Sequence, residues 1–577
     1  MLKRGLLCAA IAVALVLPAL AGAARQALLP GVSYERKVVL SGGRPVVLHV
    51  VRTPPQSGLF RLDPVLSHGT VLGRQTVPGM QARIRSRATT VGVNGDFFTL
   101  ETGESSGIFL RDGVLSSPPS LNRSALVLGL DSRIVVDVFR LTGTWQAGAF
   151  AERRLQKLNR RIATPSGISL FTPAWGGLTP RARGAVEVVL AGFPATTLGT
   201  DLTGTVVAVN RGGRTAIPPG GAVLQARGSI RGSLLAEATV GTAMTVRLRI
   251  ADFPEGALDA IGGGPVLVRN GLPVRQADEY FTLDQITKRH PRTAVGQLAD
   301  GGFLFVVADG RSASSAGLTA WAMARTMANL GAVGAMGFDG GGSSTISFDG
   351  SVLNTPSDGR PRAVANGLFL FYYGIYAPAL GTAVLSPNGD GVGESKVLSA
   401  KVVRRAALRL RLVRPDGSEA WSREEVVGPG WISRTVSDPA MPDGLWRWVA
   451  EATETATGET SRMTRTFRVN RTLGHLRLSR AFLHVRPPAG GRLSISFRLA
   501  HRARVDLGVL GLDGRPRRTL FKGELDPGTK RWRWNGRTDS GRVIPPGTYV
   551  VRVSARNEFG RVALRAPVRV LLAPPSG

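Results

Sequence analysis

The chain has 577 residues, of which 43% are hydrophobic and 6% aromatic, so it is long enough for several domains with their own cores. Its formal net charge is +33, from 73 lysines and arginines against 40 acids, which predicts attraction to polyanions. The basic residues are dispersed, and no zinc finger, RRM-type signature or heptad array accompanies them, which argues against a nucleic-acid-binding protein.

The first residues predict a secretory signal peptide over residues 1–24. Lys3 and Arg4 precede an apolar run from Leu6 to Leu20, and the small residues Ala21-Gly22-Ala23 follow it. The run is shorter than the roughly 20 residues of a membrane-spanning helix. We therefore expect cleavage near residue 23 or 24, a secreted or envelope-associated protein, and no transmembrane segment after cleavage. An uncleaved anchor is the alternative.

The single cysteine, Cys8, lies inside this apolar run. A mature chain without cysteine has no disulfides, no thiolate nucleophile and no cysteine-ligated metal.

Short apolar runs separated by turns continue to about residue 140 and predict strands, with a helical patch near residues 79–87. Among them, Asn94-Gly95-Asp96 ends an apolar run and precedes two phenylalanines. Asn-Gly favours a hairpin turn, which is one interpretation. The other places Asn94 and Asp96 at a strand end beside a pocket, where the amide offers a sugar hydroxyl both a donor and an acceptor. Residues 145–250 predict a sheet insertion or subdomain.

Charged residues recur at strand ends farther along the chain. His290-Pro291-Arg292-Thr293 opens a strand, and a guanidinium can hold two phosphate oxygens at once. A surface arginine is the alternative, and His290 is either a general acid or a packed residue. The buried-type strand Phe303 to Ala308 ends in Asp309-Gly310-Arg311, and a helix is predicted over residues 318–330.

The densest motif is Asp339-Gly340-Gly341-Gly342-Ser343-Ser344-Thr345. Glycines bring bare backbone N–H groups to a ligand, and successive N–H groups form a nest for anions. A carboxylate beside such a nest can act as an acid, a base or a metal ligand. A glycine-rich bend capped by Asp339 is the alternative. The loop over residues 354–367 adds further polar groups, with a solvated loop as the alternative.

Taken in order, these motifs resemble the phosphodiester glycosidase family, which includes the mannose 6-phosphate uncovering enzyme. The resemblance covers about residues 85–375 and rests on six segments: Asn94–Phe98, Gly262–Pro265, Pro291–Gly296, Asp309–Arg311, Asp339–Thr345 and Pro356–Gly367. It implies an α+β catalytic domain over residues 25–376 that hydrolyses a glycosyl phosphodiester. The chain lacks the cysteine-rich modules and membrane anchor of the animal enzyme, which leaves its substrate and partners open.

The expected reaction is cleavage at the anomeric C–O bond by two carboxylates. Asp339, Asp309 and Asp96 are the catalytic candidates, with the roles of acid and of nucleophile or base left open. The expected substrate contacts are Asn94, Arg292, Thr293, Arg311, Gly341, Gly342, Ser343, Ser344, Asn354, Asp358, Arg362 and Asn366. The sequence requires no cofactor and leaves the need for a divalent metal open. The expected partner is a glycosyl phosphodiester or an anionic envelope glycan, and the rival interpretation is a non-catalytic protein that binds such a glycan.

The tail predicts two β-sandwich modules, over residues 380–472 and 473–574. Trp532–Arg542 and Pro545–Val553 resemble the immunoglobulin-like repeat of the flagellar hook-capping protein, and Pro442–Trp448 is a variant of it in the first module. The expected fold class is therefore an α+β catalytic domain followed by two all-β immunoglobulin-like sandwiches. The modules serve either as spacers or as binders.

Overall fold

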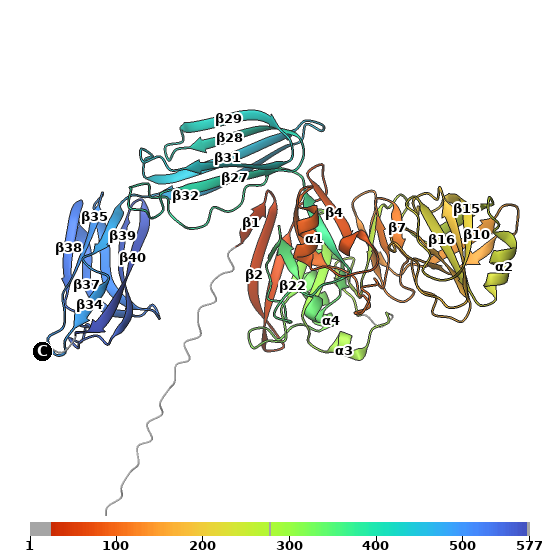
Figure 1. Cartoon of the computed structure of the whole chain (residues 1–577), viewed down its shortest axis with the longest axis horizontal. Coiled ribbons are helices and arrows are strands. Elements are labelled where there is room, and N and C mark those ends of the chain that lie inside the picture. Colours follow the sequence, from red (N-terminus) through yellow and green to blue (C-terminus); the bar gives the residue numbers. More distant parts are fainter. Residues whose placement is uncertain (1–24, 276–278, 574–577) are drawn as a thin grey trace, which may run out of the picture. The chain divides into compact units, whose positions relative to one another are not determined.

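The computed structural model describes residues 25–275 and 279–573, so the expected signal peptide over residues 1–24 lies outside the described residues. The described part contains forty strands and only four α-helices. The expected α+β catalytic domain is thus dominated by strands (Figure 1). The helices are α1 (Val77–Ile84), α2 (Ile230–Glu237), α3 (Leu283–Thr287) and α4 (Ala320–Asn329). The predicted helices near residues 79–87 and 318–330 are confirmed as α1 and α4.

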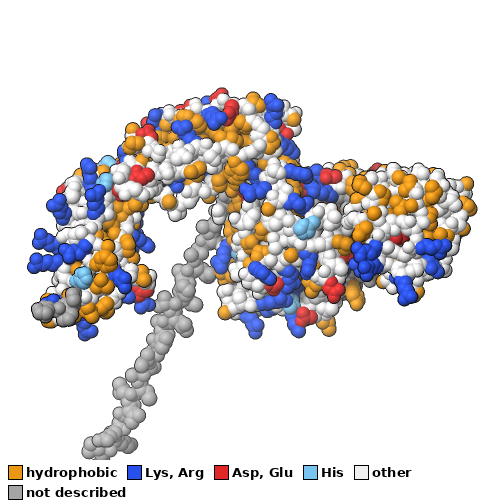
Figure 2. All heavy atoms as spheres, viewed as in Figure 1, with side chains coloured by type: hydrophobic (Ala, Val, Ile, Leu, Met, Phe, Trp, Pro, Cys, Tyr) orange, Lys and Arg blue, Asp and Glu red, His pale blue; other side chains and the backbone are white. Residues whose placement is uncertain are grey.

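The chain divides into two compact units. The first holds the residues up to Pro55 together with Asp63–Gln81 and Val91–Phe369. The second holds Gln56–Leu62, Ala82–Thr90 and the chain from Leu370 onward. Lysine and arginine side chains are spread over the visible faces of both, in keeping with the high net charge (Figure 2). Within the described residues, no helix has the length and apolar character needed to cross a bilayer.

An eight-stranded sheet carries the helix α4 in the first unit. In spatial order its strands are β1 (Gln26–Leu29), β2 (Val32–Ser41), β3 (Arg44–Arg52), β22 (Phe303–Ala308), β21 (Arg292–Leu298), β23 (Ala332–Phe338), β19 (Val266–Arg269) and β20 (Leu272–Pro273). Thr319 caps α4 by accepting a hydrogen bond from Ala322 N. Met323 and Met327 on the buried face of α4 share a core with Leu304 of β22. Burial of such side chains is the main stabilising term for a helix on a sheet.

Two five-stranded sheets complete the framework around the site. One runs β7 (Val114–Ser117), β6 (Phe109–Arg111), β18 (Asp259–Gly262), β8 (Ala125–Leu128), β9 (Ile134–Asp137). The other runs β25 (Ser351–Val352), β24 (Ile346–Phe348), β5 (Thr89–Asn94), β26 (Asn366–Tyr372), β4 (Phe60–Leu66). β5 is buried along its whole length and ends at Asn94, so the predicted strand end at this residue is confirmed.

Residues 141–250 form a second eight-stranded sheet, which we call the insert. Its order is β11 (Arg153–Leu155), β10 (Leu141–Ala147), β17 (Ala243–Ile250), β15 (Asp201–Gly212), β14 (Ala185–Ala191), β16 (Gly221–Arg227), β13 (Gly167–Phe171), β12 (Lys157–Leu158). Figure 1 shows α2 lying against this sheet. Trp145, Leu224 and Val246 are fully buried in its core, which also includes Ala260 of β18. The predicted sheet insertion is therefore confirmed.

The tail contains four further sheets. Residues 396–469 form β27 (Lys396–Val402) with β30 (Gly430–Val436), and the sheet β29 (Glu419–Val427), β28 (Ala406–Val413), β31 (Gly444–Glu454), β32 (Thr460–Val469). Residues 473–572 form β33 (Leu473–Leu478), β35 (Leu493–Leu499), β38 (Gly528–Trp534), and the sheet β34 (Phe482–Val485), β40 (Gly560–Leu572), β39 (Gly547–Asn557), β36 (Ala503–Gly511), β37 (Pro516–Leu525). The likeness to the hook-capping repeat stays a prediction.

Candidate active site

A cavity of about 230 Å³ opens in the first unit where β21 begins and β23 ends. It brings together seven of the residues expected from the sequence: Asp339, Arg292, Thr293, Arg311, Gly341, Gly342 and Arg362. Phe97, Phe281 and Leu267 supply apolar wall, and Asp284 and His290 supply further polar groups. A mostly apolar wall with a few convergent charged groups is the usual make-up of a ligand site.

Asp339 is the acid that β23 delivers to the cavity. Phe338, the residue before Asp339, pairs with Thr293 of β21. Asp339 therefore lies directly beside the start of β21. Ser343 Oγ donates a hydrogen bond of 2.6 Å to Asp339 Oδ2. Burial raises the pKa of Asp339 from 3.8 to about 6, against the opposing effects of the Ser343 hydroxyl and the Arg362 charge. A carboxyl group with this pKa can hold or release a proton near neutral pH, as acid–base catalysis requires.

The glycines after Asp339 let the chain turn between two arginines. Gly341 has φ +61°, a conformation that favours glycine, and a Cβ there would lie 3.0 Å from Arg311 Nη2. A Cβ on Gly342 would collide with Arg362 and Asp358. Four N–H groups of the expected anion nest are already used. Gly341 N donates to Pro291 O, Ser343 N to Gly340 O, Ser344 N to Gly341 O and Thr345 N to Asn94 Oδ1. The glycines thus mainly allow side chains to approach the turn closely, rather than forming an open nest of amides.

The three arginines that line the cavity differ in their partners. Arg292 is partly buried, and donates through Nε to Leu318 O at 2.9 Å and through Nη2 to Gln285 O at 2.6 Å. Burial lowers its pKa to about 10. Arg362 pairs with Asp358 at 2.7 Å, and Asp358, an expected contact residue, does not line the cavity. Arg311 is exposed and reaches the glycine turn, so it is the most available of the three to a ligand.

A hydrogen-bonded chain of three side chains, which begins at Asp284 of α3, lines the cavity. Arg311 Nη2 lies 3.1 Å from His290 Nδ1, and His290 Nε2 lies 3.1 Å from Asp284 Oδ2. A guanidinium only donates, so His290 Nδ1 accepts and Nε2 carries the proton that Asp284 accepts. Hydrogen bonds from Lys288 and then His290 lower the pKa of Asp284. The cavity therefore holds one carboxyl group with a raised pKa and one with a lowered pKa.

Three asparagines expected to touch substrate are instead buried and bonded to the protein. Asn94 donates to Asp339 O at 2.7 Å and accepts from Thr293 Oγ1 and Thr345 N. Asn366 Oδ1 accepts from Asp96 N at 2.8 Å. The side chain of Asn354 bonds to Ile346 N and Ser344 O. These amides fix the loops that carry the site, and they have little capacity left for a sugar hydroxyl.

Two of the three expected catalytic acids do not line the cavity. Asp96 is fully buried, and its carboxylate accepts from Phe97 N at 2.8 Å, from Ser105 Oγ at 3.2 Å and from Gly107 N. Burial raises its pKa to about 6, opposed first by the Gly107 N–H group. Asp309 is buried against His49, with Nε2 to Oδ2 at 3.0 Å, and accepts from Thr355 N at 3.1 Å. The strand-end pattern named all three acids as catalytic candidates but could not tell which one faces a cavity.

Ser344 Oγ is buried without a hydrogen-bond partner and does not line the cavity. Within residues 25–275 and 279–573, no group of three or more His, Cys, Asp and Glu side chains is placed to hold a metal ion.

Arg123 and Asp284 are the residues that the sequence pattern missed. The Arg123 guanidinium lies 4.6 Å from the ring centre of Phe97 and 5.2 Å from that of Phe281. No local motif marks this arginine. Asp284 had a local signal, because Thr282 and Gln285 form a capping box at the start of α3.

Comparison with known proteins supports part of the expected identity. Residues 196–371 match the family model described as phosphodiester glycosidase. This part of the chain carries a phosphodiester glycosidase family domain. The matched segment starts in the insert and ends in β26, so it includes Asp339 and the three cavity arginines, whereas Asn94 and Asp96 precede it.

Individual proteins resemble parts of this chain. The uncharacterized SPbeta prophage-derived protein YomE of Bacillus subtilis is 36% identical over 118 residues, 20% of this chain and 18% of that protein. A hypothetical protein from Synechocystis has a TM-score of 0.52 at 22% identity, covering 59% of this chain and 62% of its own. The catalytic domain of zebrafish N-acetylglucosamine-1-phosphodiester alpha-N-acetylglucosaminidase has a TM-score of 0.33 at 16% identity. This match covers 59% of this chain and 83% of the zebrafish chain. The Synechocystis likeness shows a shared fold, and this chain spans less than two thirds of both that protein and YomE.

Proposed function

We propose that this protein hydrolyses a glycosyl phosphodiester at the anomeric C–O bond. The observation that carries the proposal is Asp339, a carboxyl group with a pKa of about 6 in a cavity lined by Arg292, Arg311 and Arg362. A proton donor beside several fixed cations suits a reaction whose leaving group is a phosphate. The phosphodiester glycosidase match over residues 196–371 supports the same reaction class.

In the proposed reaction, protonated Asp339 donates its proton to the bridging oxygen as the C1–O bond breaks. A water molecule supplies the oxygen that joins C1, and the products are the free sugar and a phosphate monoester. Asp284 is the second carboxylate of the cavity and stays ionised, so it is suited to stabilise positive charge at C1 or to receive the water proton. We assign Asp96 and Asp309 to the support of the site rather than to chemistry.

The arginines have separate proposed roles. Arg311 lies beside Gly341 and is the first candidate to hold the phosphate, with Arg362 beside the next glycine of the turn. Arg292 ties the α3 segment to the start of β21 through carbonyl groups, and its charge adds to the positive potential of the cavity. Removal of a fixed donor at a developing charge typically lowers kcat by about 10²–10³-fold.

We also propose export, on the basic, apolar and small-residue pattern of residues 1–24. An exported enzyme of this class would act on envelope or extracellular glycans. The rival function, non-catalytic binding of an anionic glycan, is favoured by the high positive charge alone.

The test is hydrolysis of a panel of sugar-1-phosphodiesters by the purified protein in water labelled with oxygen-18. The proposal predicts label on the sugar hydroxyl at C1 and none on the released phosphate monoester. Label on phosphate would mean P–O cleavage and would contradict the proposed bond. Binding of the panel without turnover would favour the rival function.

A further inference from the structure

A second hollow of about 470 Å³, here called the basic groove, lies in the first unit. Four of its lining residues are cationic: Arg123, Arg154, Lys157 and Arg160. None of the lining residues is acidic. One wall comes from the insert, through β11, β12 and the turn after them, and another from the loop over residues 118–123. A concave surface lined by one sign of charge focuses the potential and concentrates anions.

Acidic side chains of the protein neutralise little of the positive charge on these four residues. Arg160 donates to Ser117 Oγ at 3.1 Å and faces Glu104 at 3.8 Å. Burial lowers the pKa of Arg160, so a further anion would compensate a charge that is poorly solvated. Among the described residues, Arg154 and Lys157 have no ion-pair partner. The groove therefore carries an excess of positive charge that the protein itself does not balance.

The groove is continuous with the wall of the proposed active site. Arg123 lines the groove and stacks on Phe97 and Phe281, both of which line the cavity. Tyr280 lines the groove and is followed directly by Phe281 of the cavity. Tyr280 N also donates to Asn122 O at 3.0 Å, which joins the loop over residues 118–123 to the segment that carries Phe281. A ligand that extends from the cavity past these two phenylalanines meets the cations next.

We propose that the basic groove binds a second phosphate group of the substrate, so that the substrate class is a glycan chain carrying several phosphates rather than an isolated sugar-1-phosphodiester. This inference rests on the proposed function of the cavity. Arginine suits the role because its planar donors bind two phosphate oxygens together. In this proposal, the insert extends the substrate-binding surface beyond the cavity.

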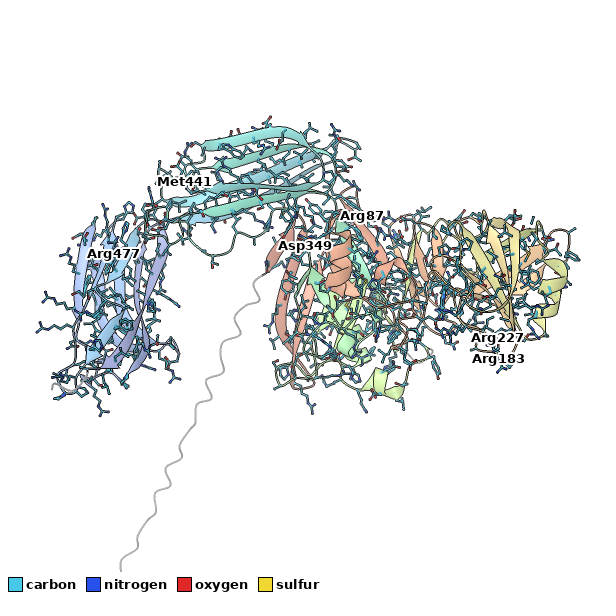
Figure 3. All side chains as sticks on the ribbon, in the orientation of Figure 1. Arg87, Arg183, Arg227, Asp349, Met441 and Arg477 are labelled. Carbon is cyan, nitrogen blue, oxygen red and sulfur yellow. The ribbon has the colours of Figure 1, made fainter. Side chains whose placement is uncertain are left out.

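The variant that tests the groove is R154A/K157A, which removes two cations that lie outside the cavity. The matched control is R181A/R183A, which removes two exposed arginines of the insert that do not line the groove (Figure 3 labels Arg183). The first measurement is calorimetric binding of inorganic tripolyphosphate to the full chain. We expect Kd to rise about tenfold in R154A/K157A and to stay within about twofold in the control. Equal weakening in both variants would overturn the groove as a site, since general charge would then explain binding.

The second measurement compares two substrates with the same sugar-1-phosphodiester, one of which carries an additional phosphate on the leaving group. We expect R154A/K157A to raise KM about tenfold for the doubly phosphorylated substrate and to leave the parameters for the singly phosphorylated one unchanged. An equal rise for both substrates would overturn the second-phosphate role. If the wild-type protein cleaves neither substrate, the proposed function fails, and the tripolyphosphate measurement still decides whether the groove binds phosphate. Tighter binding of an oligonucleotide than of a phosphorylated glycan of equal charge would assign the groove to a different ligand.

Discussion

The hydroxyl of Ser343 donates a hydrogen bond of 2.6 Å to Oδ2 of Asp339. This bond favours the ionised carboxylate and so limits the rise in pKa that burial causes. The bond fixes one carboxylate oxygen of Asp339, and Asp339 still lines the cavity. The proton-transfer properties of the site thus depend on a side chain that does not itself line the cavity.

Ser343→Ala is therefore expected to raise the pKa of Asp339 above about 6. Because a general acid must be protonated, kcat/KM of the wild type should fall as pH rises through about 6, and the variant should lose activity at a higher pH. A pH profile of kcat/KM on a small sugar-1-phosphodiester measures the shift. Ser344→Ala is the control, since the Ser344 hydroxyl has no hydrogen-bond partner and its loss should leave the profile in place. Activity that increases with pH through this range would show that Asp339 acts as a base instead.

Asn94→Ala should destabilise the first unit and also slow the reaction. The amide bonds to Asp339 O, Thr293 Oγ1 and Thr345 N, and the side chain is fully buried. Each buried group left without a partner costs about 1–3 kcal/mol, so the total loss in the free energy of unfolding should exceed about 2 kcal/mol. Thermal unfolding followed by a kcat measurement at low temperature checks both effects. An unchanged Tm would mean that water replaces the amide at no cost.

Asp309→Asn should have the opposite pattern to a change at Asp339. Its carboxylate accepts from Thr355 N and Asn354 Nδ2 on one oxygen and faces His49 on the other. Asparagine in its place keeps one acceptor oxygen but turns an NH2 group toward one of these partners. We expect a loss of about 2 kcal/mol in the free energy of unfolding, with kcat per folded molecule nearly unchanged. Chemical unfolding and an active-site-normalised assay give the two numbers. A large fall in kcat without a loss of stability would restore Asp309 to the catalytic set.

Asp96 should make stability depend on pH in a defined direction. Burial raises its pKa in the folded state from 3.8 to about 6, so between these values the folded chain binds more protons than the unfolded chain. Its contribution to stability is complete below about pH 4 and is lost as pH rises to about 6, with a total of about 3 kcal/mol. Urea unfolding of the wild type and Asp96→Asn at pH 4, 5 and 6 measures the difference in slope. Parallel pH dependences in the two proteins would contradict the assignment.

The sequence predicted the cavity well where the signal was local. Asp339, Gly341 and Gly342 lie together in one motif, and their neighbours in sequence are also neighbours in the site. Arg292 was found because an Arg-Thr pair opens a strand, and Arg311 because Asp309-Gly310-Arg311 follows one. The insert and α4 followed from hydrophobic periodicity.

The rest depended on contacts between distant residues. Asp96, Asp309 and Asp339 all follow apolar strands, and only the fold reveals that Asp309 faces His49, 260 residues earlier in the chain. Asn94 looked like a sugar contact because its amide partners, Thr293 and Thr345, lie far along the sequence. Arg123 could not be predicted for the same reason, since its environment is two aromatic rings contributed by separate segments.

The kcat of Asp339→Asn on a small chromogenic sugar-1-phosphodiester, measured with thermal unfolding on the same preparation, tests the central claim most directly. The substitution preserves size and removes the proton that the mechanism needs. We predict a fall in kcat of about 10²–10⁴-fold with Tm nearly unchanged. Turnover close to the wild-type value, or a lower Tm with unchanged activity per folded molecule, would contradict it.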